Sequence, residues 1–167
     1  MHRYLLVLLA LSAGLLASGA VSGQQASPQA GKNTAELQQA RVLLKFGRDD
    51  IVKEEMRFSE AEAEAFWPVY DRYDADLLVI RDRYAELVTG YTAAYRAGTV
   101  SEAQANQIID DYLEIQSELL RIKRKYLGDF RKVLPARKAA RFYQLENKME
   151  VELEFQLAQV IPLIDPV

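Results

Sequence analysis

The chain has 167 residues, no cysteine, a single histidine, 27% charged residues and a formal net charge of −3. Thiols and imidazoles are the side chains that most often serve as nucleophiles, bases and transition-metal ligands. The composition excludes disulfide bonds. Because His2 lies in a segment that we expect to be removed, it also excludes the usual zinc or copper sites and catalysis through a Cys–His or Ser–His pair.

Residues 1–23 have the pattern of a secretory signal peptide. A short positive start is followed by an apolar run over residues 4–17 and by small residues that signal peptidase accepts. This run of 14 residues is shorter than the ~20 that a membrane-spanning helix needs. We expect cleavage after Ala20 or Gly23 and export, which in a bacterium means the periplasm. A retained membrane anchor is the alternative; after cleavage no stable membrane insertion is expected.

The rest of the chain divides into three parts. Residues 24–33 are polar, contain proline and glycine, and are expected to form a disordered leader. Residues 34–160 are predicted to be a single helical domain, because apolar residues recur at intervals of three and four. Residues 161–167 form an apolar tail that we expect to pack on this domain.

Two long helices are predicted from heptad repeats. The first repeat alternates steps of four and three: Phe66, Tyr70, Tyr73, Leu77, Ile80, Tyr84, Leu87, Tyr91 and Ala94. The second has one irregular step: Ala105, Ile108, Tyr112, Ile115, Leu119, Ile122, Tyr126, Phe130 and Val133. Shorter amphipathic segments precede and follow them. We therefore predict an all-α fold of four helices, in which the two long ones form an antiparallel hairpin that reverses at Gly98 and is bent by Pro68 near Glu64.

Two helix starts carry the sequence of a capping box. At Ser59 and Ser101 a hydroxyl can accept the backbone N–H three residues on, and Glu62 or Gln104 can accept the N–H of that serine. Pro135 is expected at the first position of the last helix, without a capping side chain before it. Beginning a helix is the whole role that we expect of these residues.

Charge is strongly polarised along the chain. Residues 121–148 carry a net +8, residues 49–86 a net −7, and four acids but no base follow Lys148. In an antiparallel hairpin, three aspartates (Asp71, Asp74 and Asp76) would lie near Arg121, Arg124 and Lys125 and fix the register. The remaining bases could meet the acidic tail, a second chain or a ligand. The candidate binding cations are Arg121, Lys125, Arg131, Arg137 and Arg141.

Tyrosine is unusually common on the predicted seam. Tyr70, Tyr73, Tyr84 and Tyr91 all fall on the first repeat. A buried tyrosine hydroxyl needs a hydrogen-bond partner or water. One interpretation is therefore that these tyrosines are core residues whose hydroxyl groups reach water. A broad amphipathic face that accepts other polypeptides is the other, and it makes these four tyrosines candidate binding residues.

Catalytic and cofactor motifs are absent from the sequence. There is no phosphate-binding glycine loop, no G-x-S-x-G, no H-E-x-x-H and no EF-hand spacing. We therefore expect no enzyme, cofactor or metal site. The acidic pI of 5.3 in an exported chain also argues against nucleic acid as a partner.

These features resemble the Spy/CpxP-like periplasmic proteins, which carry LTxxQ motifs. The counterparts of the motif are Phe58–Glu62 and Leu134–Lys138, and Val100–Gln104 is similar to it in sequence. The stretches AFWPVYDRY (65–73) and VLPARKAARFYQLENK (133–148) are similar to those of uncharacterised proteobacterial exported proteins. The resemblance implies a bent, dimeric helical cradle that holds unfolded clients or a sensor domain during envelope stress. The metal-sensing branch uses histidines, which this chain lacks after position 2.

Two functions are therefore expected from the sequence. The first is an ATP-independent periplasmic chaperone or stress adaptor that binds unfolded or envelope proteins. The second is a structural or signalling module that binds one folded partner. A homodimer is expected in either case, because a single hairpin cannot cover both long seams. An enzyme that uses carboxylates on an envelope polymer is a third and less favoured possibility.

Overall fold

The computed structural model describes residues 47–165, and in this range the prediction of an all-α fold with four helices is confirmed. Residues 47–56 are helical and are followed by α2 (Glu60–Arg96), α3 (Glu102–Val133) and α4 (Ala136–Val160). The predicted signal peptide and polar leader lie outside the described residues.

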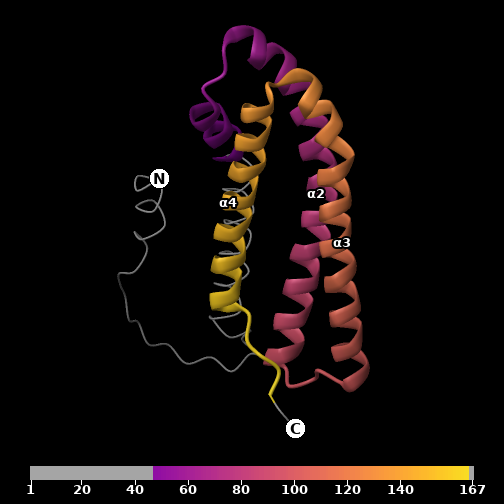
Figure 1. The fold of residues 1–167 in the computed structure, drawn as a ribbon. Helices are drawn as coiled ribbons and strands as arrows, with labels where there is room; N and C mark the ends of the chain where they lie inside the picture. Colours follow the sequence, from indigo (N-terminus) through magenta and orange to yellow (C-terminus); the bar gives the residue numbers. More distant parts are fainter. Residues whose placement is uncertain (1–46, 166–167) are drawn as a thin grey trace, which may run out of the picture.

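Helices α2 and α3 run antiparallel and side by side over their whole length (Figure 1). The 37 residues of α2 span ~55 Å, much more than the width of the molecule. The Tyr126 hydroxyl of α3 donates to the backbone oxygen of Arg72 (3.1 Å) and to the carboxylate of Asp76 (2.9 Å). Between the helices, Gly98 adopts a φ of 64°, which glycine enters without the Cβ penalty of other residues.

Both capping boxes form. The Glu62 N–H donates to the Ser59 hydroxyl (3.3 Å), and the Ser59 N–H donates to the Glu62 carboxylate (2.8 Å). Ser101 and Gln104 make the same two bonds at 3.3 and 2.9 Å. Helix α4 starts differently from the prediction, because Pro135 has an extended ψ of 146° and is the capping residue rather than the first helical one. Its carbonyl accepts the Ala139 N–H.

Helix α2 continues through Pro68. Proline has no N–H to donate to the carbonyl four residues earlier, here that of Glu64. Figure 1 shows the first turns of α2 leaning over from the axis of the rest of the helix. This end of the molecule is where residues 47–56 and the start of α4 pack against α2.

An aromatic cluster fills the core at the bent end. Its buried rings come from α2, α3 and α4, with centroids 4.5–6.4 Å apart: Phe66, Tyr70, Tyr73, Phe130 and Phe142. Val52 and Met56 of the first helical segment are fully buried against it. Phe58 packs against Phe66 in a tilted arrangement, with ring centroids 4.5 Å apart. Most of the dry core is therefore concentrated at one end of a long molecule.

Helix α4 is held away from α2 by tyrosine side chains. No Cα of α2 lies within 8 Å of a Cα of α4. Instead, the Tyr84 hydroxyl donates to the Glu154 carboxylate (3.3 Å), and the Tyr91 hydroxyl donates to the Pro162 carbonyl (2.6 Å). From the other side, the Tyr143 hydroxyl of α4 donates to the Lys123 carbonyl of α3 (2.7 Å). The rings act as spacers between the α2–α3 pair and α4.

The seam and the tail differ in detail from the prediction. Val88 rather than Leu87 is the buried residue near the end of α2, and Tyr112 of α3 is 39% exposed. In the tail, Ile161 packs on the core, but the side chain of Leu163 is almost fully exposed. Only the beginning of the tail therefore packs on the bundle.

Candidate functional site

A buried ion pair lies at the centre of the bent end. One guanidinium nitrogen of Arg48 lies 2.6 Å from both carboxylate oxygens of Glu146, and the Tyr73 hydroxyl donates to the same carboxylate at 2.8 Å. The side chains of Arg48 and Glu146 are 6% and 2% exposed. This pair ties residues 47–56 to α4 across the aromatic cluster.

Two further charges of α2 surround this pair. Asp74 lies 4.0 Å from Arg48 and 3.2 Å from Arg81, and Arg81 lies 4.0 Å from Glu146. The Nε of Arg48 has no hydrogen-bond partner, although it is buried. The two cations and two carboxylates balance in charge, but the hydrogen bonding of the group is incomplete.

The protonation states follow from burial and from the neighbouring charges. Burial alone would lower the pKa of Arg48, but the adjacent Glu146 carboxylate raises it above the ordinary arginine value. Burial and the nearby Arg48 lower the pKa of Arg81. Burial and Glu146 raise the pKa of Tyr73, so this hydroxyl remains a donor. Tyr73 therefore stays protonated as a donor to Glu146 and is not available as a base.

The sequence analysis did not identify Arg48 or Glu146 as functional residues, although a signal for Glu146 was present. Glu146 is one of only two acids in the basic stretch 121–148. It also lies four residues after Phe142 and three before Met149, both buried, and so falls on the apolar stripe of its helix. A charge in that position needs a buried partner. The partner itself is fixed only by the tertiary fold.

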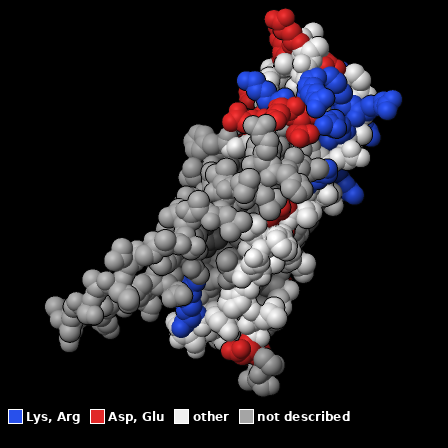
Figure 2. Space-filling view, turned by 90° about the vertical axis from the view of Figure 1, so that its left-hand side faces the viewer, with Lys and Arg blue, Asp and Glu red and all other residues white. Residues whose placement is uncertain are grey.

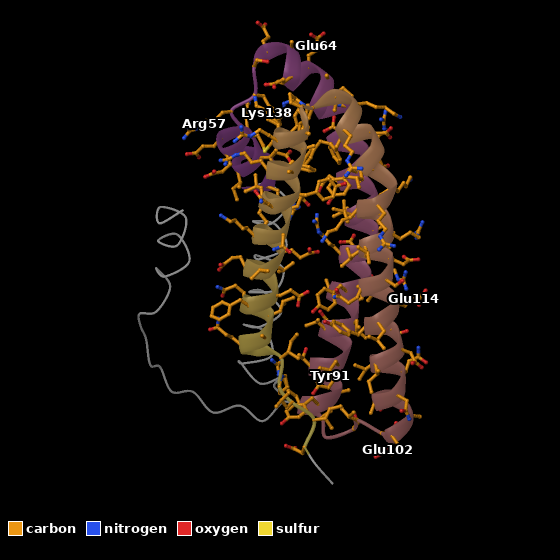
Figure 3. The ribbon with its side chains drawn as sticks, in the orientation of Figure 1. Arg57, Glu64, Tyr91, Glu102, Glu114 and Lys138 are labelled. Atoms are coloured by element: carbon orange, nitrogen blue, oxygen red, sulfur yellow. The ribbon has the colours of Figure 1, made fainter. Side chains whose placement is uncertain are left out.

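The four candidate tyrosines are buried instead of forming an exposed surface. Tyr70 and Tyr73 belong to the aromatic cluster, and Tyr84 and Tyr91 bond α4 and the tail. Figure 3 shows Tyr91 at the far end of α2 from the aromatic cluster, beside the C-terminal tail. Within this chain they are core and spacer residues, so we do not include them in a binding surface.

The candidate cations divide into two groups. Lys125 pairs with Asp76 (2.7 Å), Arg141 with Glu55 (3.0 Å) and Arg121 with Glu118 (3.7 Å). Arg131 and Arg137 are exposed and have no ion-pair partner among residues 47–165. The excess of base around the α4 start is therefore partly balanced by acids of residues 47–62, rather than only by the predicted partners, namely the acidic tail, a second chain or a ligand.

This balance is visible at the surface. Figure 2 shows acidic and basic side chains crowded together at the upper end of the face that carries residues 47–56 and α4. Lys138 contributes to it, since its ammonium pairs with Glu62 and also donates to the Arg57 carbonyl (3.2 Å); Figure 3 places Lys138 beside Arg57. Arg141 likewise donates to the Glu55 carbonyl (2.9 Å).

A second candidate surface lies on the outer side of α3. Ile109, Leu113 and Leu120 are 56%, 58% and 50% exposed and are spaced by four and seven residues. Exposed charged residues extend the same line: Glu102 at the start of the helix, and Arg124 and Arg131 toward its end. At 3.6 residues per turn these six positions fall within an arc of about 60°. We call this surface the α3 outer face.

In the sequence, Ile109, Leu113 and Leu120 form a second heptad-like line beside the predicted seam. The predicted seam of this helix runs through Ile108, Tyr112 and Ile115 and does not include Ile109 and Leu113. In residues 47–165 no helix is long and apolar enough to cross a membrane, and no acidic or histidine cluster could hold a metal ion.

The chain was compared with protein families, curated proteins and solved structures. No protein-family model, no curated protein and no solved structure matches this chain.

Proposed function

We propose that the chain is an exported, ATP-independent chaperone or envelope-stress adaptor that binds unfolded polypeptides on the α3 outer face. The observation that supports this most directly is the line of half-exposed Ile109, Leu113 and Leu120. Apolar side chains in one line on a rigid helix are typical of a surface that binds another chain. Export rests on residues 1–23, which lie outside the described residues.

The chemistry of the surface fits holding rather than tight binding. Burying the exposed half of each of these three side chains contributes on the order of 1 kcal/mol. Arg124 and Arg131 add attraction for acidic chains, which salt weakens. After the entropy cost of association, such a contact is weak, so a client can leave without ATP. This supports a binding role rather than a catalytic one.

An aggregation assay tests this proposal. The mature chain should suppress aggregation of an unfolding client at near-stoichiometric ratio, and less well at high salt. Leu113→Asp with Leu120→Asp should reduce suppression at least about fivefold, because an apolar segment bound there would remove water from the carboxylates. Val79→Asp is the matched control, since Val79 is equally exposed on α2. No suppression by the wild-type chain at any ratio would refute the chaperone role.

We also propose that the free protein is a homodimer in which the same face meets a second copy. Two α3 helices that run antiparallel about a point between Gln116 and Ser117 would place Leu113 against Leu120 of the other copy. In the same register Glu102 meets Arg131 of the other copy. The α3 outer face therefore brings leucines together near its centre and opposite charges together at its ends, as an isologous interface requires.

A charge swap tests this interface. Glu102→Lys should raise the dimer dissociation constant about tenfold, because it converts two attractive pairs per dimer into repulsive ones. Adding Arg131→Glu in the same chain should restore the dimer. The measurement is mass by light scattering or sedimentation at micromolar concentration. A monomeric wild-type chain, or a double variant no better than the single one, would contradict the proposed interface.

A specific folded partner is the second candidate. The ordered charge of the α3 outer face, acidic at Glu102 and basic at Arg131, favours one partner in one register. A pull-down from envelope extract that yields a single stoichiometric protein, together with no suppression of client aggregation, would favour this signalling or structural role.

A further inference from the structure

At the bent end, residues 47–58, helical up to Met56, cover the aromatic cluster and Glu146, Lys138 and Arg141. We call the surface that this segment covers the groove. This segment touches the rest of the chain through one face. Arg48, Val52 and Met56, each four residues after the last, are buried, whereas Asp49, Asp50 and Lys53 are exposed. A helix that inserts one stripe into an apolar groove is a common mode of peptide recognition.

The groove contacts the segment in three ways. Its floor is the aromatic cluster, which covers Val52 and Met56. At one end the carboxylate of Glu146, itself 2% exposed and bonded by Tyr73, receives the guanidinium of Arg48. At the other end Arg141 and Lys138 donate to the carbonyls of Glu55 and Arg57, where the helix ends and its carbonyls lack partners within the helix.

The segment is joined to α2 by a short and strained link. Residues 57–59 are not helical, and Arg57 has a φ of 47°, which costs a residue with a Cβ more than it costs glycine. Local opening that releases residues 47–58 without unfolding α2 and α3 is therefore accessible.

We propose that this groove is a binding site for amphipathic helical segments of other polypeptides, and that residues 47–58 occupy it in the resting state. The segment that it accepts has an arginine followed by apolar residues four and eight positions later. Glu146 selects the arginine, because a helix without a cation would leave a carboxylate buried without a counter-charge. This site is separate from the α3 outer face and does not depend on the function proposed for that face.

Competition between segments gives a quantitative test. An external helix can bind only those molecules whose groove is open. Its apparent dissociation constant is therefore the intrinsic dissociation constant divided by the open fraction. The probe is a fluorescent peptide of residues 47–59, titrated into the full mature chain. In the Arg48→Ala chain, residues 47–58 should bind the groove less tightly, so the groove is open more often. This chain should therefore bind the probe at least about tenfold more tightly than wild type. The Lys53→Ala chain, altered on the exposed side of the same segment, should bind it as wild type does.

The arginine requirement is tested with a second peptide. A peptide of the same length with Arg48→Ala should bind the Arg48→Ala chain at least about tenfold more weakly than the natural peptide, because no cation then reaches Glu146. Equal binding of the two peptides, or equal binding of the natural peptide by wild-type and Arg48→Ala chains, would overturn the proposal.

Hydrogen exchange on the wild-type chain covers the case in which the variant does not fold. Excess natural peptide should speed exchange of amides 47–58 and leave those of α2 and α3 unchanged. Unchanged exchange at every peptide concentration would overturn the proposal.

A second outcome concerns the dimer. If the chain does not bind the peptide, and the wild-type chain is a dimer but the Arg48→Ala chain is a monomer, then the segment of a second copy occupies the groove and the proposal is likewise wrong. Loss of peptide binding with aggregation suppression intact would refute this site alone.

Discussion

At the scale of single residues, the most informative side chains are acids on the inner side of α4. Glu146 is buried and paired with Arg48, whereas Glu154 is partly buried and accepts a hydrogen bond from the Tyr84 hydroxyl, at 3.3 Å. Burial raises the pKa of Glu154 above its ordinary value, although the bond from Tyr84 acts in the opposite direction. The folded chain therefore binds this proton more tightly than the unfolded chain does.

This raised pKa predicts a pH dependence of stability. The stabilising contribution of protonated Glu154 is fully present below the ordinary glutamate pKa of about 4.3 and is lost as the pH rises through the folded value. Glu154→Gln imitates the protonated state. The variant should match wild type near pH 3.5 and be more stable than wild type at pH 7.

Urea unfolding at several pH values measures this difference, with Glu152→Gln, on the exposed side of the same helix, as the control. A Glu154→Gln variant that is less stable than wild type at pH 7, by an amount that does not change with pH, would contradict the assignment of the shift to burial.

At the scale of helices, the distinctive feature is the use of tyrosine rings to separate α4 from α2. Packed helices usually lie 8–10 Å apart between axes, as set by the side chains at the contact. Here Tyr73, Tyr84 and Tyr91 span the larger separation and end in hydrogen bonds to α4 or the tail. The tyrosine-rich seam is therefore explained by distance rather than by contact with water.

This arrangement predicts that ring volume matters more than the hydroxyl at position 84. Tyr84→Phe keeps the ring and should cost about 1 kcal/mol or less of unfolding free energy, the value of one hydrogen bond. Tyr84→Leu leaves a void between the helices and should cost about 2 kcal/mol or more. Chemical denaturation of the two variants distinguishes these effects, and equal losses would show that α4 is held by the hydroxyl instead.

The sequence was sufficient to predict local features of the helices but not how α4 and residues 47–58 are placed. Ser59 and Ser101 begin helices through contacts within four residues, and those contacts can be read from the sequence alone. The pair Arg141–Glu55 depends on the turn at Arg57, whose positive φ no pattern indicates. The Arg48–Glu146 pair joins residues 98 positions apart for the same reason.

At the scale of the whole molecule, the net charge of −3 conceals a polarised chain in which most charges are used internally. Acids of residues 47–62 meet bases of α4, and Asp76 meets Lys125 of α3. On the α3 outer face, exposed Ile109, Leu113 and Leu120 lie in line with the exposed bases Arg124 and Arg131. This surface is the basis for the proposed polypeptide binding.

The most direct test of that binding is site-specific photo-crosslinking to an unfolding client. A photoreactive phenylalanine analogue at position 113 should crosslink the client efficiently, and the same group at position 79 should not, although both positions are exposed to a similar extent. Excess unlabelled client should abolish the crosslink. Equal crosslinking at the two positions, or none at position 113 under conditions where aggregation is suppressed, would contradict a client-binding role for the α3 outer face.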